Sequence, residues 1–217
     1  MSNRYALAGA SGLVGRALAQ ALSADPRCTE LNLLLRRPLP ALEAVMDGYQ
    51  VLPIAQAAAL GDLFCTVTGT CAVIGREQFL AVDKDAVLAF ATACNEAGVR
   101  HFELLSSVGV DSRSRTFYLR AKGELEDGLR ALGFERLSLF HPSMILTPEN
   151  RYGFSQAVTL AVWPKLTPLL GGSLRKLRGI PVAQLGAAMA RNVATAGAGE
   201  ETLEWDAIVK LAARVPG

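Results

Sequence analysis

Tyr118 and Lys122 are the residues of this chain whose types and spacing are best suited to chemistry. They lie four positions apart, so on a helix both side chains project from one face. A free tyrosine has a pKa of about 10, and proton transfer near neutral pH needs a value lower by roughly three units, about 4 kcal/mol. An ammonium group beside the phenol favours the phenolate and lowers that pKa. The pair therefore predicts a tyrosine that donates and accepts a proton.

Two serines, Ser106 and Ser107, precede this pair and directly follow the apolar run 99–105, which is typical of a strand. A serine hydroxyl at the end of a strand can hold a substrate oxygen beside the phenol. Because successive side chains of a strand point to opposite faces, only one of the two serines can do so. We assign Ser107 to this role, and Ser106 remains the alternative.

The N-terminal segment carries three glycines in the pattern G-x-x-G-x-x-G. A short apolar strand over 4–8 precedes this turn, and an amphipathic helix over 12–24 follows it. Glycine lets the backbone approach a pyrophosphate closely, and the N-terminus of the next helix attracts negative charge. An ordinary loop is the alternative, but the strand–turn–helix context favours a dinucleotide site. Its predicted residues are Gly9, Ser11, Gly12, Leu13, Val14 and Gly15.

The end of the second strand, over 31–35, indicates which dinucleotide is bound. NAD sites usually carry an acidic residue at this distance from the glycine turn, where it binds the ribose 2′-hydroxyl. This chain has Arg36 and Arg37 there instead. Guanidinium groups bind a 2′-phosphate, which a carboxylate would repel. We therefore predict NADP (NADPH) as the cofactor, with Arg36 the stronger candidate; two solvated arginines after a strand are the alternative.

The composition describes a globular chain of 217 residues, of which 51% are hydrophobic and 19% charged. Its formal net charge is only +2 and no basic run occurs, so nucleic acid is not an expected partner. The four cysteines lack metal-ligand spacing, and we expect no metal site. The sequence shows neither a signal peptide nor a membrane-spanning run, which predicts a soluble cytoplasmic protein.

Strand-like and helix-like segments alternate along the chain. Further strands are expected over 49–52, 63–67, 99–105 and 136–140, and further helices over 77–97 and 116–132. This alternation predicts an α/β fold, a doubly wound parallel sheet of the Rossmann type with helices on both faces. We expect residues 1–217 to form a single domain, in which 143–217 provide a small C-terminal substrate-side cap and closing helices.

In this order, the glycine turn, the serines and the tyrosine–lysine pair resemble the short-chain dehydrogenase/reductase superfamily over nearly the whole chain. The resemblance is greatest to its compact atypical branch, which includes the Tat-interacting-protein-like oxidoreductases and relatives of sugar-nucleotide epimerases. Three further segments, 67–70, 79–83 and 140–143, match that branch.

The resemblance implies an NADP-binding fold in which Ser107, Tyr118 and Lys122 are the catalytic residues. Tyr118 would exchange the proton, and Lys122 would hold the hydroxyls of the nicotinamide ribose and lower the pKa of the phenol. The segment after the sixth strand would cover the nicotinamide. Further cofactor contacts are implied for Thr68, Gly69, Thr70, Ser106, Tyr118, Lys122 and Pro142.

Two positions depart from the common pattern of the superfamily. An Asn that serves a proton relay in many members is matched here by Asp83, and the Arg that commonly precedes the proline after the sixth strand is replaced by His141. We interpret His141 as structural, with substrate contact as the alternative. His101, early in the fifth strand, is also interpreted as structural.

The expected activity is hydride transfer between the nicotinamide and a small carbonyl or alcohol substrate, so the expected partner is a small molecule. Three alternatives stay open: epimerase or dehydratase chemistry on a sugar nucleotide, a redox-sensing protein that holds NADPH without turnover, and a structural subunit with a vestigial cofactor site. The apolar segment 157–164 is a candidate homodimer interface, with burial against the sheet as the alternative.

Overall fold

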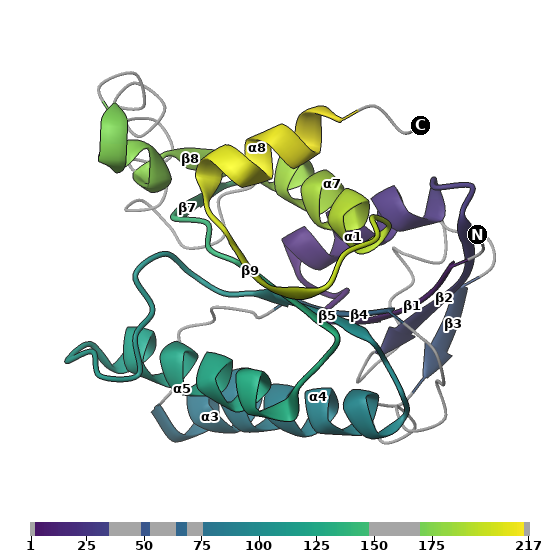
Figure 1. Ribbon diagram of the computed structural model, residues 1–217, viewed down its shortest axis with the longest axis horizontal. Coiled ribbons are helices and arrows are strands. Elements are labelled where there is room, and N and C mark those ends of the chain that lie inside the picture. The colour runs from purple at the N-terminus through teal and green to yellow at the C-terminus, as the bar shows by residue number, and fades with distance from the viewer. Residues whose placement is uncertain (1–2, 35–48, 53–63, 69–75, 148–169, 215–217) are drawn as a thin grey trace.

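The computed structural model describes residues 3–34, 49–52, 64–68, 76–147 and 170–214. These residues form a seven-stranded sheet of order β3-β2-β1-β4-β5-β6-β9, in which every pairing is parallel (Figure 1). The strands are β1 (Asn3–Ala8), β2 (Cys28–Leu34), β3 (Tyr49–Leu52), β4 (Phe64–Thr68), β5 (His101–Leu105), β6 (Arg136–Phe140) and β9 (Gly199–Leu203). A separate two-stranded sheet joins β7 (Met144–Leu146) and β8 (Gly179–Pro181).

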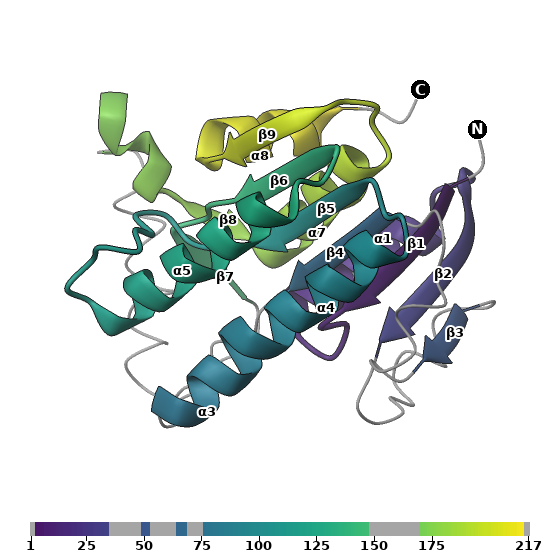
Figure 2. The same ribbon diagram turned by 60° about the horizontal axis from the view of Figure 1, so that its bottom comes forward.

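Helices cover both faces of the large sheet, and Figures 1 and 2 show them as two layers. One layer contains α1 (Leu13–Ser23), α7 (Val182–Val193) and α8 (Trp205–Ala213). The other contains α3 (Arg76–Leu80), the π-helical turn η2 (Ala81–Asp85), α4 (Ala86–Glu96) and α5 (Phe117–Leu132). The short 3-10 helix η4 (Gly172–Leu177) precedes β8. This arrangement confirms the predicted doubly wound α/β fold.

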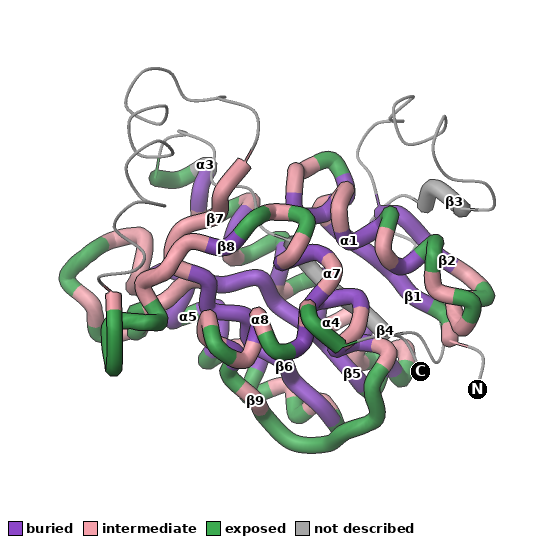
Figure 3. Tube along the Cα trace, turned by 90° about the horizontal axis from the view of Figure 1, so that it is seen from above, coloured by how far each residue is buried: buried purple, intermediate pink, exposed green. Residues whose placement is uncertain are grey.

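The central strands are buried on both faces, which is why their sequences are almost continuously apolar. In β1, Tyr5 and Leu7 pack into the core beneath α1 and α7, whereas Ala6 and Ala8 pack into the core beneath α4. Figure 3 shows the buried residues running through β1, β5 and β6. The large sheet is therefore the rigid frame to which the loops at its carboxyl edge are attached.

The strand order reverses at β1, because β2 and β3 lie on one side of it and β4 lies on the other. Ligands of open parallel sheets bind beyond the carboxyl ends of the strands at such a reversal. β1 ends at Ala8, and the glycine turn begins at the next residue. The topology thus places the turn at the position where this fold holds ligands.

The helix predicted over 77–97 is interrupted by the π-helical turn η2. The apolar spacing of that helix favours Val82 as a core residue, but the structure leaves Val82 half-buried and buries Asp83 instead. A π-helical turn holds more residues than an α-helical one, so it changes which side chains face the neighbouring helix. Such turns are frequent at functional sites.

β9 pairs with β6 at the edge of the large sheet and is not among the strands expected from the sequence. Its residues Glu200 and Thr202 are exposed, so the strand lacks the apolar pattern by which the other strands were identified. Within the described part of 143–217, β9 therefore extends the main sheet and α7 packs against α1. The candidate interface 157–164 lies outside the described residues. No helix in the described part of the chain is long and apolar enough to cross a membrane.

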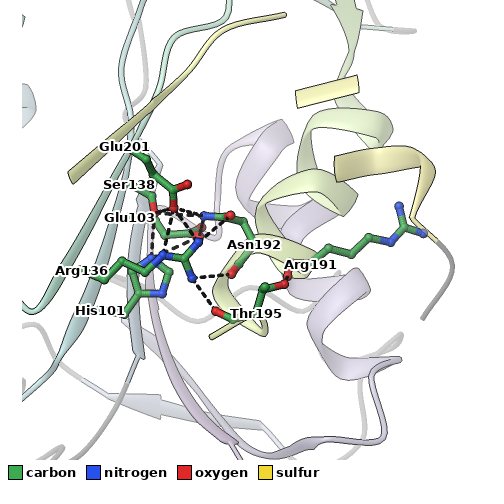
Figure 4. Close-up of polar contacts among 8 residues, drawn as sticks. All are labelled: His101, Glu103, Arg136, Ser138, Arg191, Asn192, Thr195 and Glu201. Atoms are coloured by element: carbon green, nitrogen blue, oxygen red, sulfur yellow. Dashed lines mark hydrogen bonds and ion pairs between the residues drawn. The ribbon is translucent and has the colours of Figure 1, made fainter. Parts of the chain in front are cut away.

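A buried polar cluster lies beneath α7 and joins it to three strands of the sheet (Figure 4). Its members come from β5, β6, α7 and β9 and are His101, Glu103, Arg136, Ser138, Asn192 and Glu201. The Arg136 guanidinium donates to Glu201 at 2.5 Å, and Asn192 Nδ2 donates to Glu103 Oε1 at 2.7 Å. His101 Nε2 lies 2.9 Å from Ser138 Oγ, in agreement with a structural role for this histidine.

Glu103 is the more deeply buried of the two acidic residues in this cluster. It is fully buried, and no described residue forms a hydrogen bond with its Oε2. Burial raises the pKa of Glu103 well above its usual range, opposed by the hydrogen bond from Asn192 and the charge of Arg136. Between the unfolded and the folded pKa of Glu103, the folded state therefore keeps a proton on this carboxyl that the unfolded state has released. The resulting stability is complete below the unfolded pKa, near 4.5, and is lost as pH rises through the folded pKa.

We therefore predict that Glu103→Gln increases the free energy of unfolding relative to the native chain, and increases it more at higher pH. The amide keeps an acceptor for Asn192 and cannot ionise. The difference should grow with a slope of up to about 1.4 kcal/mol per pH unit until Glu103 ionises in the folded state. Urea unfolding at several pH values between about 5 and 8 measures it. Glu135→Gln, on the surface, is the matched control; a difference independent of pH for Glu103→Gln would show that its carboxyl is already ionised when folded.

Candidate functional site

The glycine turn joins β1 to α1 through a compact backbone. Gly9 has φ +87°, a left-handed conformation that other residues rarely adopt. The Gly12 amide donates to the Gly9 carbonyl oxygen at 2.9 Å, and Gly12 is the N-cap of α1. A Cβ at Gly15 would lie 2.1 Å from the Gly9 oxygen, so the first turn of the helix touches the glycine turn through backbone atoms alone. This close packing is what the dinucleotide prediction requires of the third glycine.

The electrostatics of this end of α1 suit a phosphate. The first turn of the helix contains no acidic residue, so its free amides and positive dipole end are not neutralised. Ser11 is exposed and Leu13 is half-buried, whereas Val14 is buried in the core. Val14 can therefore offer a dinucleotide only its backbone. The turn fits a pyrophosphate group.

The other predicted cofactor residues are placed only in part. Thr68 is the last residue of β4, the strand next to β1, so its backbone lies at the same edge as the glycine turn. Arg36, Arg37, Gly69 and Thr70 lie outside the described residues.

The two serines after β5 have different environments. Ser106 is buried, with 6% of its surface exposed, and its hydroxyl donates to Glu126 Oε1. Ser107 is half-buried and directly follows this anchored residue. Because the Ser106 proton is engaged by Glu126, the geometry favours Ser107 as the serine that would face a substrate.

Tyr118 and Lys122 lie on the first two turns of α5, which begins at Phe117. The α5 helix packs beside η2 and α4, as Figure 2 shows. The ring of Tyr118 is half-buried and lies against Phe79 of α3, with 5.6 Å between ring centroids. Phe79 also packs on Phe117 at 5.7 Å. Aromatic contacts therefore hold the start of α5 and the tyrosine ring.

One turn further along α5, Lys122 forms a buried ion pair with Asp83 of η2. Lys122 Nζ lies 3.7 Å from Asp83 Oδ1, and the two residues are only 3% and 2% exposed. Asp83 Oδ2 has no hydrogen-bond partner among the described residues. Burial raises the pKa of Asp83, and the charge of Lys122 opposes that rise. Asp83, which matches the proton-relay Asn of many superfamily members, is thus the ionic partner of Lys122, the predicted catalytic lysine.

His141 and Glu126 complete the site, and sequence reasoning missed Glu126. His141 Nε2 lies 2.8 Å from Glu126 Oε1, and both residues are buried, in agreement with a structural role for His141. Ser106, His141 and Glu126 are the residue types of a hydrolase triad, but here the carboxylate lies between the other two. The Ser106 hydroxyl donates its hydrogen bond to Glu126 and not to His141. The histidine therefore does not activate the serine as a nucleophile. Glu126 follows Lys122 by four residues, a spacing that could have indicated it.

The loops after β5 and β6 are held together and against α5. The Val108 amide donates to the Pro142 carbonyl at 3.1 Å, which places the buried Pro142 beside the loop that follows Ser107. On α5, a Cβ at Gly123 would lie 2.2 Å from the Ser112 backbone nitrogen. The loop between the serines and Tyr118 therefore rests on the helix backbone next to Lys122.

The glycine turn, the order of strands and the residues at this edge define a Rossmann-type dinucleotide-binding protein. Residues 1–114 match the family described as the S-adenosyl-L-homocysteine hydrolase NAD-binding domain. The chain is also 33% identical to the protein HTATIP2 of Rattus norvegicus over 215 residues, covering 94% of this chain and 86% of that protein. The chain thus belongs to the HTATIP2 family of atypical short-chain dehydrogenase/reductase-like proteins, and its first 114 residues to the NAD-binding-domain family.

Solved structures of low sequence identity share the fold. MoeE5 in complex with UDP-glucuronic acid and NAD has a TM-score of 0.67 and 17% identity, covering 93% of this chain and 75% of that one. Vestitone reductase from alfalfa (Medicago sativa L.) has a TM-score of 0.65 and 14% identity, covering 93% of this chain and 76% of that one.

The packing of the loop between Ser107 and Tyr118 on α5 predicts that Gly123→Ala is destabilising. The added methyl group would collide with backbone atoms of Ser112 and Asp111, which cannot move without displacing the loop. We expect a loss of about 1–3 kcal/mol in the free energy of unfolding. Gly128→Ala on the same helix is the matched control, because its methyl would meet only the end of the Leu88 side chain at 3.0 Å. The control should be neutral or stabilising by roughly 0.5–1 kcal/mol. Chemical denaturation compares them, and equal effects would contradict the close approach at Gly123.

Proposed function

We propose that this protein is an NADPH-dependent oxidoreductase that reduces a small carbonyl substrate or oxidises the corresponding alcohol. The observation that carries the proposal is the placement of Tyr118 and Lys122 on one face of α5, which packs on the strand ends beside Ser107. The glycine turn lies at the same edge of the sheet, after β1. A proton donor and a dinucleotide site on one edge are what carbonyl reduction needs.

The residues that would hold the dinucleotide lie in the glycine turn, at the start of α1, at the end of β4 and just after β2. The backbone of Gly9, Gly12 and Gly15 and the N-terminus of α1 would bind the pyrophosphate, with Thr68 at the end of β4 nearby. Arg36 and Arg37 would bind the 2′-phosphate. When bound, NADPH would supply the hydride that adds to the carbonyl carbon.

The chain's own residues would supply the proton and position the substrate. Tyr118 would donate its phenol proton to the substrate oxygen as negative charge develops there, and would regain a proton from solvent. Lys122 would stabilise the phenolate by its charge, while Asp83 holds the ammonium in place. Ser107 would donate a hydrogen bond to the same substrate oxygen and so orient it.

Epimerase or dehydratase chemistry on a sugar nucleotide is the second candidate function. It is supported by the likeness of the fold to MoeE5, whose structure contains UDP-glucuronic acid and NAD. The same tyrosine would then remove a proton from a sugar hydroxyl, and the dinucleotide would be regenerated in each cycle. Net consumption of NADPH with a simple carbonyl substrate distinguishes the reductase from this alternative.

The catalytic assignment predicts that Tyr118→Phe binds NADPH like the native chain but reduces carbonyl substrates poorly. Removing the phenol hydroxyl removes the proton donor, and we expect kcat to fall by about 10²–10⁴-fold. The dissociation constant of NADPH should change by less than about twofold, because the ring keeps its contact with Phe79. Absorbance at the NADPH band with a carbonyl panel, and fluorescence titration, measure the two quantities.

Phe117→Leu is the control for this substitution, since Phe117 shares the contact with Phe79 but carries no hydroxyl. It should retain most of the turnover. Equal turnover by Tyr118→Phe and the native chain refutes the role of Tyr118, and NADPH binding without turnover in the native chain favours a redox-sensing protein.

The cofactor assignment predicts that Arg36→Ala and Arg37→Ala weaken NADPH binding selectively. Losing a charge-assisted hydrogen bond to the 2′-phosphate costs about 1.5–3 kcal/mol, which is roughly 10–150-fold in the dissociation constant. NADH lacks that phosphate, so its affinity should stay nearly unchanged. Fluorescence titration with both dinucleotides compares them. Equal affinities of the native chain for NADH and NADPH contradict the preference.

A further inference from the structure

Glu126 connects α5 to two different strand ends of the large sheet. Its side chain is only 3% exposed, and one oxygen, Oε1, accepts from Ser106 Oγ and lies 2.8 Å from His141 Nε2. The other oxygen, Oε2, lies 3.3 Å from the Arg130 guanidinium one turn along the helix. A buried carboxylate is costly unless hydrogen bonds satisfy it, and here both oxygens are engaged.

The partners of Glu126 are anchored in the sheet. Ser106 directly follows β5, and its amide donates to the Phe140 carbonyl of β6 at 2.8 Å. His141 directly follows β6, and its amide donates to the Leu203 carbonyl of β9 at 2.8 Å. The next residues along the chain are Ser107 and Pro142. Glu126 therefore holds the two positions from which the loops of the site begin.

Glu126 also lies on the same face of α5 as the predicted proton donor. It follows Lys122 by four residues and Tyr118 by eight, so it lies about 6 Å and about 12 Å from them along the helix axis and is turned from them by only about 40° and about 80°. A hydrogen bond at this position limits both rotation of the helix about its axis and sliding along it. Either movement would shift Tyr118 relative to Ser107.

We propose that Glu126 is a positioning residue that sets the placement of Tyr118 relative to Ser107 through its shared hydrogen bonds to Ser106 and His141. This inference rests on the proposed function, because it assigns Glu126 a role in the same site. It differs from a role in stability alone. The neighbouring Leu125 and Leu129 are fully buried and already anchor α5 by apolar packing, whereas an acid with two directional partners adds orientation.

Three substitutions on α5 test the proposal. Glu126→Gln keeps an acceptor oxygen for Ser106 and His141, and Glu126→Leu removes it at similar size. Glu124→Leu removes an exposed acid of the same helix, whose ion pair within the described residues is with Lys84. We expect Glu126→Leu to lower kcat by about 10–100-fold, because small misplacements at a reacting centre cost that much. KM for NADPH should change by less than about twofold, since the glycine turn is not altered. Glu126→Gln and Glu124→Leu should stay within about threefold of the native kcat.

Amide hydrogen exchange gives a readout independent of turnover. The amides of Ser106 and Val108 donate across the two strand ends, so both should exchange faster in Glu126→Leu and at the native rate in the other two variants. Ser106→Ala provides a milder substitution should Glu126→Leu not fold, and is expected to lower kcat by about 3–10-fold with unchanged KM for NADPH.

The outcomes separate this inference from the proposed function. If Glu126→Leu exchanges these amides faster at an unchanged kcat, or changes neither quantity, the positioning role is overturned. A Glu126→Gln variant as impaired as Glu126→Leu also overturns it, because the charge and not the shared acceptor would then matter. If the native chain binds NADPH but reduces no carbonyl, the proposed function fails. Exchange at Ser106 and Val108 then decides alone whether Glu126 holds the strand ends.

Discussion

The docking of α5 on the ends of β5 and β6 is the constraint on which the candidate site depends. Glu126 links the helix to Ser106 and His141, and the backbone of the loop between Ser107 and Tyr118 rests on Gly123 without space for a side chain. A helix on an open sheet can otherwise slide and rotate, since apolar packing is not directional. Hydrogen bonds and a backbone contact are directional, so they define one placement of the helix.

Nearer its N-terminus, α5 meets α3 and η2 through two successive pairs of residues. Phe79 contacts Tyr118, and one turn later Asp83 pairs with Lys122. The tyrosine and lysine are therefore each held by a partner of matching character, an aromatic ring and a carboxylate. The π-helical turn brings Asp83 into this contact, where its carboxyl is buried beside the Lys122 ammonium. Both π-helical turns and buried ionisable groups are frequent at active sites.

The sheet brings this helix and the glycine turn to one edge. All seven strands run in the same direction, so every strand end lies on the same side. In the sheet, β4 and β5 lie between β1, which leads into the glycine turn, and β6. The strand order reverses at β1, and open parallel sheets bind their ligands at such a reversal. The buried cluster around Glu103 and Arg136 lies under α7, on the other face, and ties β9 to the frame.

The sequence by itself determined the local parts: the strand, turn and helix around Gly9, the bounds of α5 up to the glycine at 133, and the spacing of Tyr118 and Lys122 on one helix face. These follow from backbone geometry and periodicity over a few residues. The tertiary structure decided that Ser106 bonds Glu126, twenty positions away, that Asp83 rather than Val82 is buried, and that Glu103 meets Asn192 across 89 positions. Such contacts depend on how separate helices and strands are aligned when they pack. A pattern over a few neighbouring residues does not contain that alignment, so it cannot predict which polar side chains will face each other.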